Sequence, residues 1–272
     1  MPISNDQKIR IKEIVKDILL SRRENFPEDS LTIRNAPFHS AFLEAFRDKL
    51  EAVDIEPAYL VVLASWMHGL NTSLGSGFEN IAHILSGGFK RKFTKEFTLK
   101  VTEIQSIAIQ SIITGLKAGT RLPNLQIEND EILSPIVPEE ILIDGLGFTA
   151  DNYCETDSIV ECIELKSVRP NSGEGRGEKQ KILYGKAAFK KLYPNKTIKF
   201  YIGFPFDPTS DTPTGYDKER FMNYLIEFKK FFAPEEILIA SELWDHLSGQ
   251  KNTMEQLLDI VSETVRQFQE SQ

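Results

Sequence analysis

The chain has 272 residues, of which 41% are hydrophobic and 26% charged, and its formal net charge is −8. This composition is ordinary for a globular protein and excludes a fibrous or largely disordered chain. The longest apolar run, residues 58–67, is too short to span a bilayer, and the polar first residues contain no apolar signal region. We therefore expect a cytoplasmic protein.

The cysteine and histidine pattern gives no sign of a zinc site. Cys154 and Cys162 do not form a Cys-x-x-Cys pair, and the four histidines are scattered along the chain. Structural zinc sites need several such ligands at short, regular spacings. We expect reduced thiols and no zinc.

Charge is distributed unevenly along the chain. Residues 166–199 contain ten basic and two acidic residues, so this segment carries +8 and the remainder carries −16. A basic segment on an acidic protein would direct one surface toward a polyanion such as DNA. The alternative interpretation is a solvated, lysine-rich helix face.

The first part of the chain is predicted to be helical. Apolar residues recur at helical spacing over residues 8–20, 36–50, 57–68, 78–85 and 103–116. Residues 69–77, rich in Gly, Ser and Asn, predict a loop that lacks the Gly-Lys-Ser/Thr ending of a phosphate-binding P-loop. Residues 89–95 are basic and aromatic, which fits either a DNA contact or a solvated connector. Residues 1–122 are therefore predicted to form a helical N-terminal region.

The pattern changes after residue 122. Strands are predicted over 141–148, 158–168 and 196–204, and a helix over 178–192 joins the last two. This order predicts a right-handed crossover between parallel strands. Residues 170–177 predict a glycine-rich, mobile linker; helices are expected over 217–232 and 253–268, and a strand and helix within 234–249. We expect an α/β fold with a mixed central β-sheet flanked by helices, in which residues 123–272 form the core.

The strand over 158–168 carries the chemistry. Glu164 and Lys166 are two positions apart, so their side chains share one face of the strand. Asp144, 20 residues before Glu164, follows the preceding apolar run. An acid and an amine on an apolar strand are costly to bury unless they are paired or bind a metal.

Phosphodiester hydrolysis explains why these residue types would come together. Two carboxylates at the end of a hairpin can bind Mg²⁺, and a neighbouring lysine can orient or deprotonate the attacking water. The pattern therefore predicts a Mg²⁺-dependent nuclease with Asp144 and Glu164 as metal ligands and Lys166 beside them. The structural alternative is a surface ion pair on an edge strand.

Over about residues 79–204 the sequence resembles the PD-(D/E)xK nuclease superfamily. The resemblance implies that Glu79, from a preceding helix, supports the metal site. Gln180 and Tyr184 are similar to the Gln-x-x-x-Tyr motif of some branches, so Gln180 would orient a phosphate or water; the alternative is a pair of ordinary helix residues.

One position departs from the superfamily pattern. Ile143 rather than proline precedes Asp144, so the identity of the first acid depends on position alone. Asp151 and Asp157 remain alternatives to Asp144.

Residues 163–188 resemble type II restriction endonucleases, in particular the TdeIII-type family. This resemblance implies a homodimer that cleaves double-stranded DNA at a short palindrome of the GGNCC kind, with a cognate DNA methyltransferase expected genetically rather than in a stable complex. The residues expected to contact phosphates or bases are Arg169, Arg176, Lys179 and Lys181. The rival hypotheses are a repair or recombination exonuclease of the same superfamily, and a non-catalytic DNA-binding protein on this fold.

Overall fold

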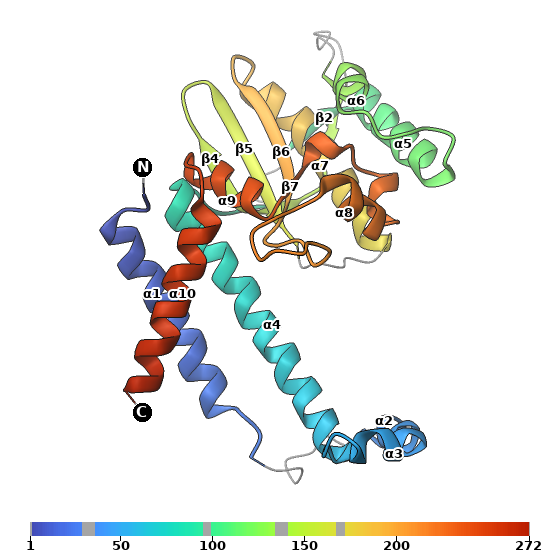
Figure 1. The fold of residues 1–272 in the computed structure, drawn as a ribbon. Coiled ribbons are helices and arrows are strands. Elements are labelled where there is room, and N and C mark those ends of the chain that lie inside the picture. Colours follow the sequence, from blue (N-terminus) through green and yellow to red (C-terminus); the bar gives the residue numbers. More distant parts are fainter. Residues whose placement is uncertain (1, 29–35, 95–98, 134–140, 167–171, 272) are drawn as a thin grey trace.

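The computed structural model describes residues 2–28, 36–94, 99–133, 141–166 and 172–271. It has a central β-sheet flanked by helices, with a long helical arm extending from one side of the sheet (Figure 1). The expected α/β fold with a mixed sheet is confirmed. Among the described helices, none combines the length and the apolar character that spanning a bilayer requires.

The central sheet has five strands in the order β1-β4-β5-β6-β7. The strands are β1 (Phe89–Phe93), β4 (Phe148–Glu155), β5 (Ile159–Leu165), β6 (Thr197–Phe204) and β7 (Ile237–Ile239). β4 is antiparallel to both β1 and β5, whereas β6 is parallel to both β5 and β7. Helix α7 (Ser172–Leu192) joins β5 to β6, so the predicted crossover between parallel strands is confirmed.

The predicted strand over 141–148 is divided between two sheets. β3 (Leu142–Asp144) pairs with β2 (Lys100–Thr102) in a separate two-stranded sheet, and β4 begins only at Phe148. Gly145 and Gly147 lie at the break, and a Cβ on Gly147 would lie 2.7 Å from the carbonyl oxygen of Phe93. The close backbone approach at these glycines separates the two strands.

The helical arm draws on both ends of the chain. Helices α1 (Asn5–Glu24), α4 (Pro57–Ser86) and α10 (Thr253–Glu270) lie side by side, with α1 in contact with the other two (Figure 1). The far end of α4 carries α2 (Pro37–Leu43), a 3-10 turn (Glu44–Phe46) and α3 (Arg47–Glu51). The predicted helix over 36–50 is therefore broken into short pieces.

The prediction of a loop over residues 69–77 is wrong, because α4 continues through these residues without interruption. The hydroxyls of Thr72 and Ser73 donate to the carbonyls of His68 and Gly69, one turn earlier. A Cβ on Gly77 would lie 2.9 Å from the Ile18 side chain, so this glycine allows α1 and α4 to approach closely. The glycines here serve helix packing rather than a turn.

Caps define where the other helices begin and end. At the start of α1, the Ser4 hydroxyl accepts a hydrogen bond from the backbone amide of Gln7. At the start of α5 (Glu103–Ala118), the Thr102 hydroxyl accepts one from the backbone amide of Gln105. α5 ends at Gly119, whose φ of 70° favours glycine. The remaining helices are α6 (Leu125–Ile132), which was not predicted, α8 (Lys218–Tyr224) and α9 (Ser241–Ser248).

Two predictions after β5 need correction. Residues 172–177, expected as part of a mobile linker, are already helical in α7, and residues 170–171 lie outside the described residues. The helix predicted over 217–232 ends at Tyr224 and is followed by a 3-10 turn, Phe228–Lys230.

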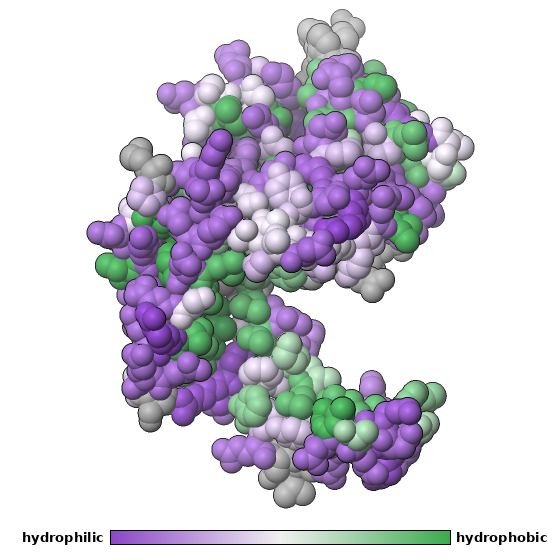
Figure 2. All heavy atoms as spheres, viewed as in Figure 1, coloured by the Kyte–Doolittle hydropathy of each residue, from purple (hydrophilic) through white to green (hydrophobic). Residues whose placement is uncertain are grey.

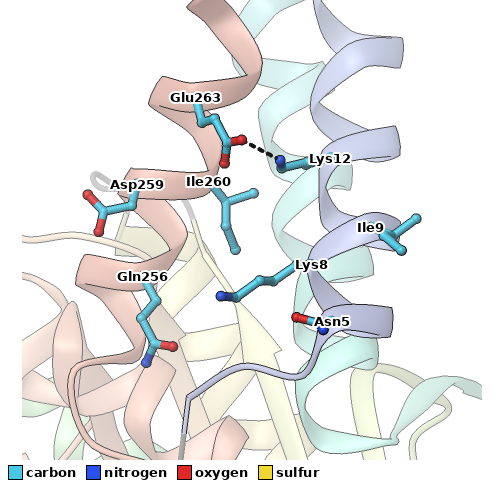
Figure 3. Close-up of a pocket in the computed structure, with 8 residues that line it drawn as sticks. All are labelled: Asn5, Lys8, Ile9, Lys12, Gln256, Asp259, Ile260 and Glu263. Carbon is cyan, nitrogen blue, oxygen red and sulfur yellow. Dashed lines mark ion pairs between the residues drawn. The ribbon is translucent and has the colours of Figure 1, made fainter. Parts of the chain in front are cut away.

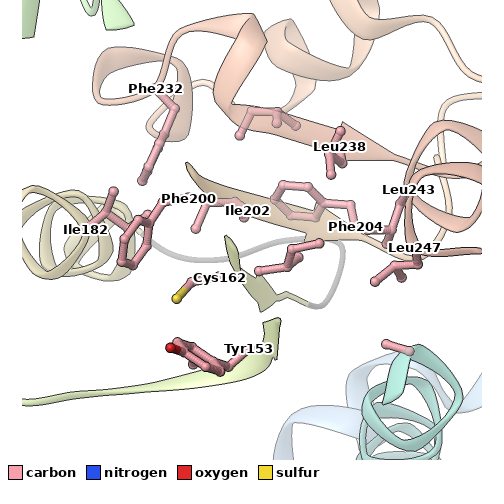
Figure 4. Close-up of a cluster of buried hydrophobic side chains, with 14 of the residues drawn as sticks. Tyr153, Cys162, Ile182, Phe200, Ile202, Phe204, Phe232, Leu238, Leu243 and Leu247 are labelled. Atoms are coloured by element: carbon pink, nitrogen blue, oxygen red, sulfur yellow. The ribbon is translucent and has the colours of Figure 1, made fainter. Parts of the chain in front are cut away.

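An aromatic cluster attaches α7 to the sheet. The ring of Phe189 on α7 lies 5.0 Å from that of Phe93 and 5.7 Å from that of Phe200. Gly185 permits this contact, because a Cβ there would lie 2.7 Å from the Phe200 ring. Figure 4 shows Phe200 and Ile182 within the continuous core between the sheet and α7. Each such side chain contributes about 1.5–3 kcal/mol when fully buried.

A buried ion cluster also attaches α7. The Lys179 Nζ lies 2.5 Å from the Glu128 carboxylate and 2.7 Å from that of Glu236, and Lys186 also approaches Glu236. All four side chains are buried. Lys179 was predicted to contact DNA; this prediction needs correction, since the side chain is completely enclosed and already paired.

We expect Lys179→Met to lower the free energy of unfolding by about 3–5 kcal/mol, because it leaves buried carboxylates without their shared counter-charge. Lys181→Met, on the same helix but 42% exposed, should cost less than about 1 kcal/mol. Urea unfolding of the two variants and the wild type measures the difference. Equal losses for Lys179→Met and Lys181→Met would contradict the interior role of Lys179.

Candidate active site

The β4–β5 hairpin brings two acids together at its open end. The ladder pairs Asn152 with Ile163, so Asp151 and Glu164 lie one residue further along each strand, opposite each other. Directly opposite residues on antiparallel strands share a face and lie close together. The Leu165 amide donates a 3.1 Å hydrogen bond to Asp151 Oδ2, which fixes that carboxylate beside the Glu164 backbone.

Asp144 lies elsewhere. It is in register with Lys100 on the two-stranded sheet and forms an ion pair with it, and its side chain is 67% exposed. The charged neighbours that act on Glu164 are Asp151, Lys166 and Glu178. The other alternative, Asp157, is exposed in the turn at the opposite end of the hairpin. Of the three candidate first acids, the structure brings Asp151 to Glu164.

The predicted Glu-x-Lys pair is present as an interaction. Lys166 Nζ lies 2.9 Å from Glu164 Oε1 and 3.2 Å from Glu178 Oε1, and its side chain is largely buried. Glu174 lies slightly further away, at 3.5 Å. Lys166 is therefore enclosed by acids from β5 and from the first turns of α7.

Sequence reasoning missed the role of Glu174 and Glu178, which it counted only as acids within a basic segment. Their signal was available, because residues four positions apart in a helix occupy one face. That spacing, directly after a Glu-x-Lys strand, places both carboxylates toward Lys166.

Glu79 reaches the cluster from α4, through a lysine that was not predicted. Lys90 Nζ lies 2.6 Å from Glu79 Oε2 and 3.3 Å from Asp151 Oδ1. Lys90 belongs to β1, within the basic and aromatic stretch that the sequence left as either a DNA contact or a connector. Lys90 bridges two acids, and it connects Glu79 to Asp151.

Burial and like charge shift the acids toward their protonated forms. Burial, and then the negative charge of Asp151, raise the pKa of Glu164 to about 7. Burial and the charge of Glu79 raise the pKa of Asp151, although the Leu165 amide and Lys90 act in the opposite direction. The site has more negative charge than its two lysines neutralise.

This charge imbalance fits a hard divalent cation. Within the described residues, no three His, Cys, Asp or Glu side chains converge as metal ligands. The two acids that the β4–β5 ladder brings together, Asp151 and Glu164, are the carboxylates that could bind one ion. Mg²⁺ commonly binds one or two carboxylates and retains several waters. A pocket of about 20 Å³ beside Glu164 and Glu178 has room for about one water.

The tyrosine of the Gln-x-x-x-Tyr pair hydrogen-bonds to α5 rather than to the acids. The Tyr184 hydroxyl lies 2.8 Å from the Ser106 hydroxyl on α5. Gln180, one turn earlier on α7, is about 200° around the helix from Glu178. Glu178, and not Gln180, supplies the α7 contact to Lys166.

Within the described part of residues 166–199, several basic side chains are buried or paired with acids. Lys179 and Lys186 are interior, and Lys166 and Lys196 pair with carboxylates. Arg169 lies outside the described residues. Of the predicted DNA contacts, Arg176 is exposed and Lys181 is partly exposed, although Lys181 also pairs with Glu178.

A larger pocket, of about 420 Å³, lies in the arm between α1 and α10 (Figure 3). Its walls include the ion pair between Lys12 and Glu263, at 2.8 Å, and none of the predicted site residues.

We expect Glu164→Gln to stabilise the metal-free protein at high pH. In the unfolded chain this carboxyl titrates near 4.5, whereas in the folded protein its pKa is about 7. Between these values the unfolded state has already lost the proton that the folded state keeps, so wild-type stability falls as pH rises. The variant should be more stable by about 1–3 kcal/mol at pH 8, and this advantage should disappear below pH 4.5.

Urea unfolding with a chelator at both pH values measures this effect, with the exposed Glu255→Gln as the matched control. A difference between Glu164→Gln and wild type that does not change with pH would show that the Glu164 charge is not costly.

Known proteins match nearly the whole chain. The family model described as type II restriction endonuclease, HinfI, matches residues 3–265. The chain is 49% identical over 268 residues to the type II restriction enzyme MjaII of Methanocaldococcus jannaschii, covering 96% of this chain and 71% of that protein. The predicted enzyme class is confirmed, although the matching family is HinfI-type rather than TdeIII-type. The chain therefore belongs to the HinfI family of type II restriction endonucleases.

Proposed function

We propose that this restriction endonuclease hydrolyses DNA by PD-(D/E)xK chemistry, with Asp151, Glu164 and Lys166 as its three central residues. The observation that carries the proposal is the pairing of Asp151 and Glu164 across the β4–β5 ladder, with Lys166 2.9 Å from Glu164. Asp151 takes the role that the sequence pattern suggested for Asp144.

Asp151 and Glu164 would bind Mg²⁺, and the carbonyl of Leu165 is a further candidate oxygen ligand between Glu164 and Lys166. The bound ion would stabilise charge on the phosphate and favour ionisation of a water. The raised pKa values of both acids support this assignment, because a divalent cation would supply the positive charge that the cluster lacks.

Lys166 is suited to holding a water and the phosphate rather than to removing a proton. Burial alone would lower its pKa, but Glu164 and Glu178 more than offset this and raise the pKa above its ordinary value. An ammonium that keeps its proton can donate hydrogen bonds to the attacking water and to a phosphate oxygen. Glu178 would position this ammonium, and Lys90 would hold Glu79 beside Asp151.

The proposed substrate is double-stranded DNA with a short palindromic site, of the GGNCC kind suggested by residues 163–188. Arg176 and Lys181 are proposed DNA contacts because Arg176 is exposed and Lys181 is 42% exposed, with its Nζ 3.0 Å from Glu178 at the edge of the acid cluster. Arg169 keeps this role as part of the proposal. The enzyme would act in the cytoplasm, with a cognate methyltransferase to protect the host DNA.

We propose that the active enzyme is a homodimer. Both strands of a duplex must be cut, and each chain contributes one set of Asp151, Glu164 and Lys166. A two-fold symmetric site is matched by a two-fold symmetric protein. The family match favours this endonuclease over the exonuclease and the non-catalytic alternatives.

Asp151→Asn should reduce Mg²⁺-dependent cleavage on the order of 10³-fold, because a metal ligand contributes several kcal/mol of charge stabilisation. Asp144→Asn, the matched change on the two-stranded sheet, should retain cleavage within about threefold. Cleavage is followed on supercoiled plasmid, and DNA binding is measured by mobility shift without metal, where all proteins should bind alike. If Asp144→Asn is the inactive variant, the assignment of Asp151 is wrong.

The function itself is tested with closed-circular plasmid and long linear DNA, with and without Mg²⁺. Discrete fragments that require both Mg²⁺ and Lys166 establish a site-specific endonuclease, and sequencing their ends gives the recognition site. Degradation from the ends of linear DNA alone would favour the exonuclease. Cleavage by Lys166→Ala at the wild-type rate would contradict the role given to Lys166.

A further inference from the structure

The end of the arm exposes large apolar side chains that the described part of the chain leaves uncovered. We define the arm tip as residues 36–56, which contain α2, the turn Glu44–Phe46 and α3. None of the residues of these three elements is buried. Phe38 and Phe42 are 79% and 75% exposed, and Phe46 and Val53 are also mainly exposed. Figure 2 shows hydrophobic side chains gathered at this end of the molecule.

The arm tip contributes little to the fold of a single chain. α2 and α3 have seven and five residues, well below the length at which an isolated helix is stable in water. α2 packs against α4, but its phenylalanines point outward. Phe38 and Phe42, four residues apart on α2, form one apolar stripe on that helix. Such a stripe favours burial against another surface.

The exposed apolar area of the arm tip is as large as that of a typical interaction site. A phenylalanine buries about 150–250 Å² when it is covered, so four apolar side chains that are mostly exposed present roughly 400 Å². A patch of this size is comparable to the largest apolar patch on a typical monomer, which is often functional. Two copies would bury about 800 Å² of apolar surface, a sufficient core for an interface of standard size.

The charge of the arm tip argues against DNA as the occupant. Residues 36–56 contain five acidic residues and two basic residues, a net charge of −3. Both bases lie beside acids, with Arg47 Nη2 2.6 Å from Glu44 and Lys49 Nζ 3.5 Å from Asp48. The phosphate backbone would be repelled by this surface. We therefore take the partner to be a protein surface rather than DNA.

We propose that the arm tip is the interface through which two copies of this chain form the active dimer. In this interface Phe38 and Phe42 of one copy pack against the same stripe of the other. A stripe related by a two-fold axis meets its own image, so no second type of surface is needed. The choice of a second copy rests on the proposed function, because a cut through both strands needs two catalytic clusters.

The location of the arm tip fits this role. Pro57 begins α4 at the tip, and Glu79 lies 22 residues further along the same helix, beside the catalytic cluster. At 1.5 Å per residue, about 33 Å of helix separates the interface from the site. A dimer joined at the tips leaves the sheet, α7 and the hollow between arm and sheet in Figure 2 uncovered for DNA.

Sedimentation velocity of the full chain tests the interface. The wild type should be a dimer at micromolar concentration, and the double variant Phe38→Ser/Phe42→Ser should dissociate at least about 100-fold more readily, since buried aromatic anchors dominate such interfaces. Both side chains are exposed in the monomer, so its circular dichroism should not change. The control is Leu122→Ser/Ile226→Ser, which removes apolar side chains that are 83% and 59% exposed elsewhere and should remain a dimer.

A second readout separates the interface from the chemistry. On supercoiled plasmid the arm-tip variant should accumulate nicked circles, while the wild type and the control should produce linear DNA. A monomeric wild type, or an arm-tip variant as dimeric as the control, would overturn the interface even if cleavage is normal. A wild-type dimer that dissociates in the arm-tip variant but never cleaves DNA would support the interface and overturn the proposed function instead.

Discussion

The repulsion between Asp151 and Glu164 is the constraint on which the rest of the site depends. The β4–β5 ladder holds these carboxylates opposite each other, and the Leu165 amide fixes one of them. Two neighbouring carboxylates can both stay ionised only where positive charges lie close by. Lys166 and Lys90 supply them, and Glu178 from α7 and Glu79 from α4 orient these lysines in turn. Five elements, β1, β4, β5, α4 and α7, must therefore be held together around one pair of acids.

The local part of this arrangement could be predicted from sequence. Glu164 and Lys166 share a strand face by spacing alone, and the apolar patterns of β5, α7 and β6 gave the parallel crossover. The partner acid could not be predicted in this way, because pairing between strands is a long-range property. The backbone break at Gly145 and Gly147 sends Asp144 to the two-stranded sheet and leaves Asp151 beside Glu164. The residue pattern of a single strand does not indicate which acid will lie opposite Glu164.

The burial of two lysines was the second property that could not be predicted from the sequence. Lys179 and Lys186 look like part of a basic surface, yet they neutralise Glu128 and Glu236 inside the protein. The partners lie 50 or more residues away in the chain, so a count of charges within the segment could not detect them. The glycines of α4 were misjudged for a related reason. Gly77 is favourable in a helix only because Ile18 of another helix occupies the space where a side chain would be.

The charged site lowers the free energy of unfolding, and the surrounding core offsets this loss. A folded state that raises the pKa of Glu164 to about 7 is opposed by that group at neutral pH, so the interior must compensate. The aromatic cluster on Phe189 and the buried ions around Lys179 lie on α7, the same helix that carries Glu178 to Lys166. A divalent cation that binds the folded state but not the unfolded chain would remove part of this cost and stabilise the protein. The same excess of negative charge that makes the site expensive to fold is what would attract the metal.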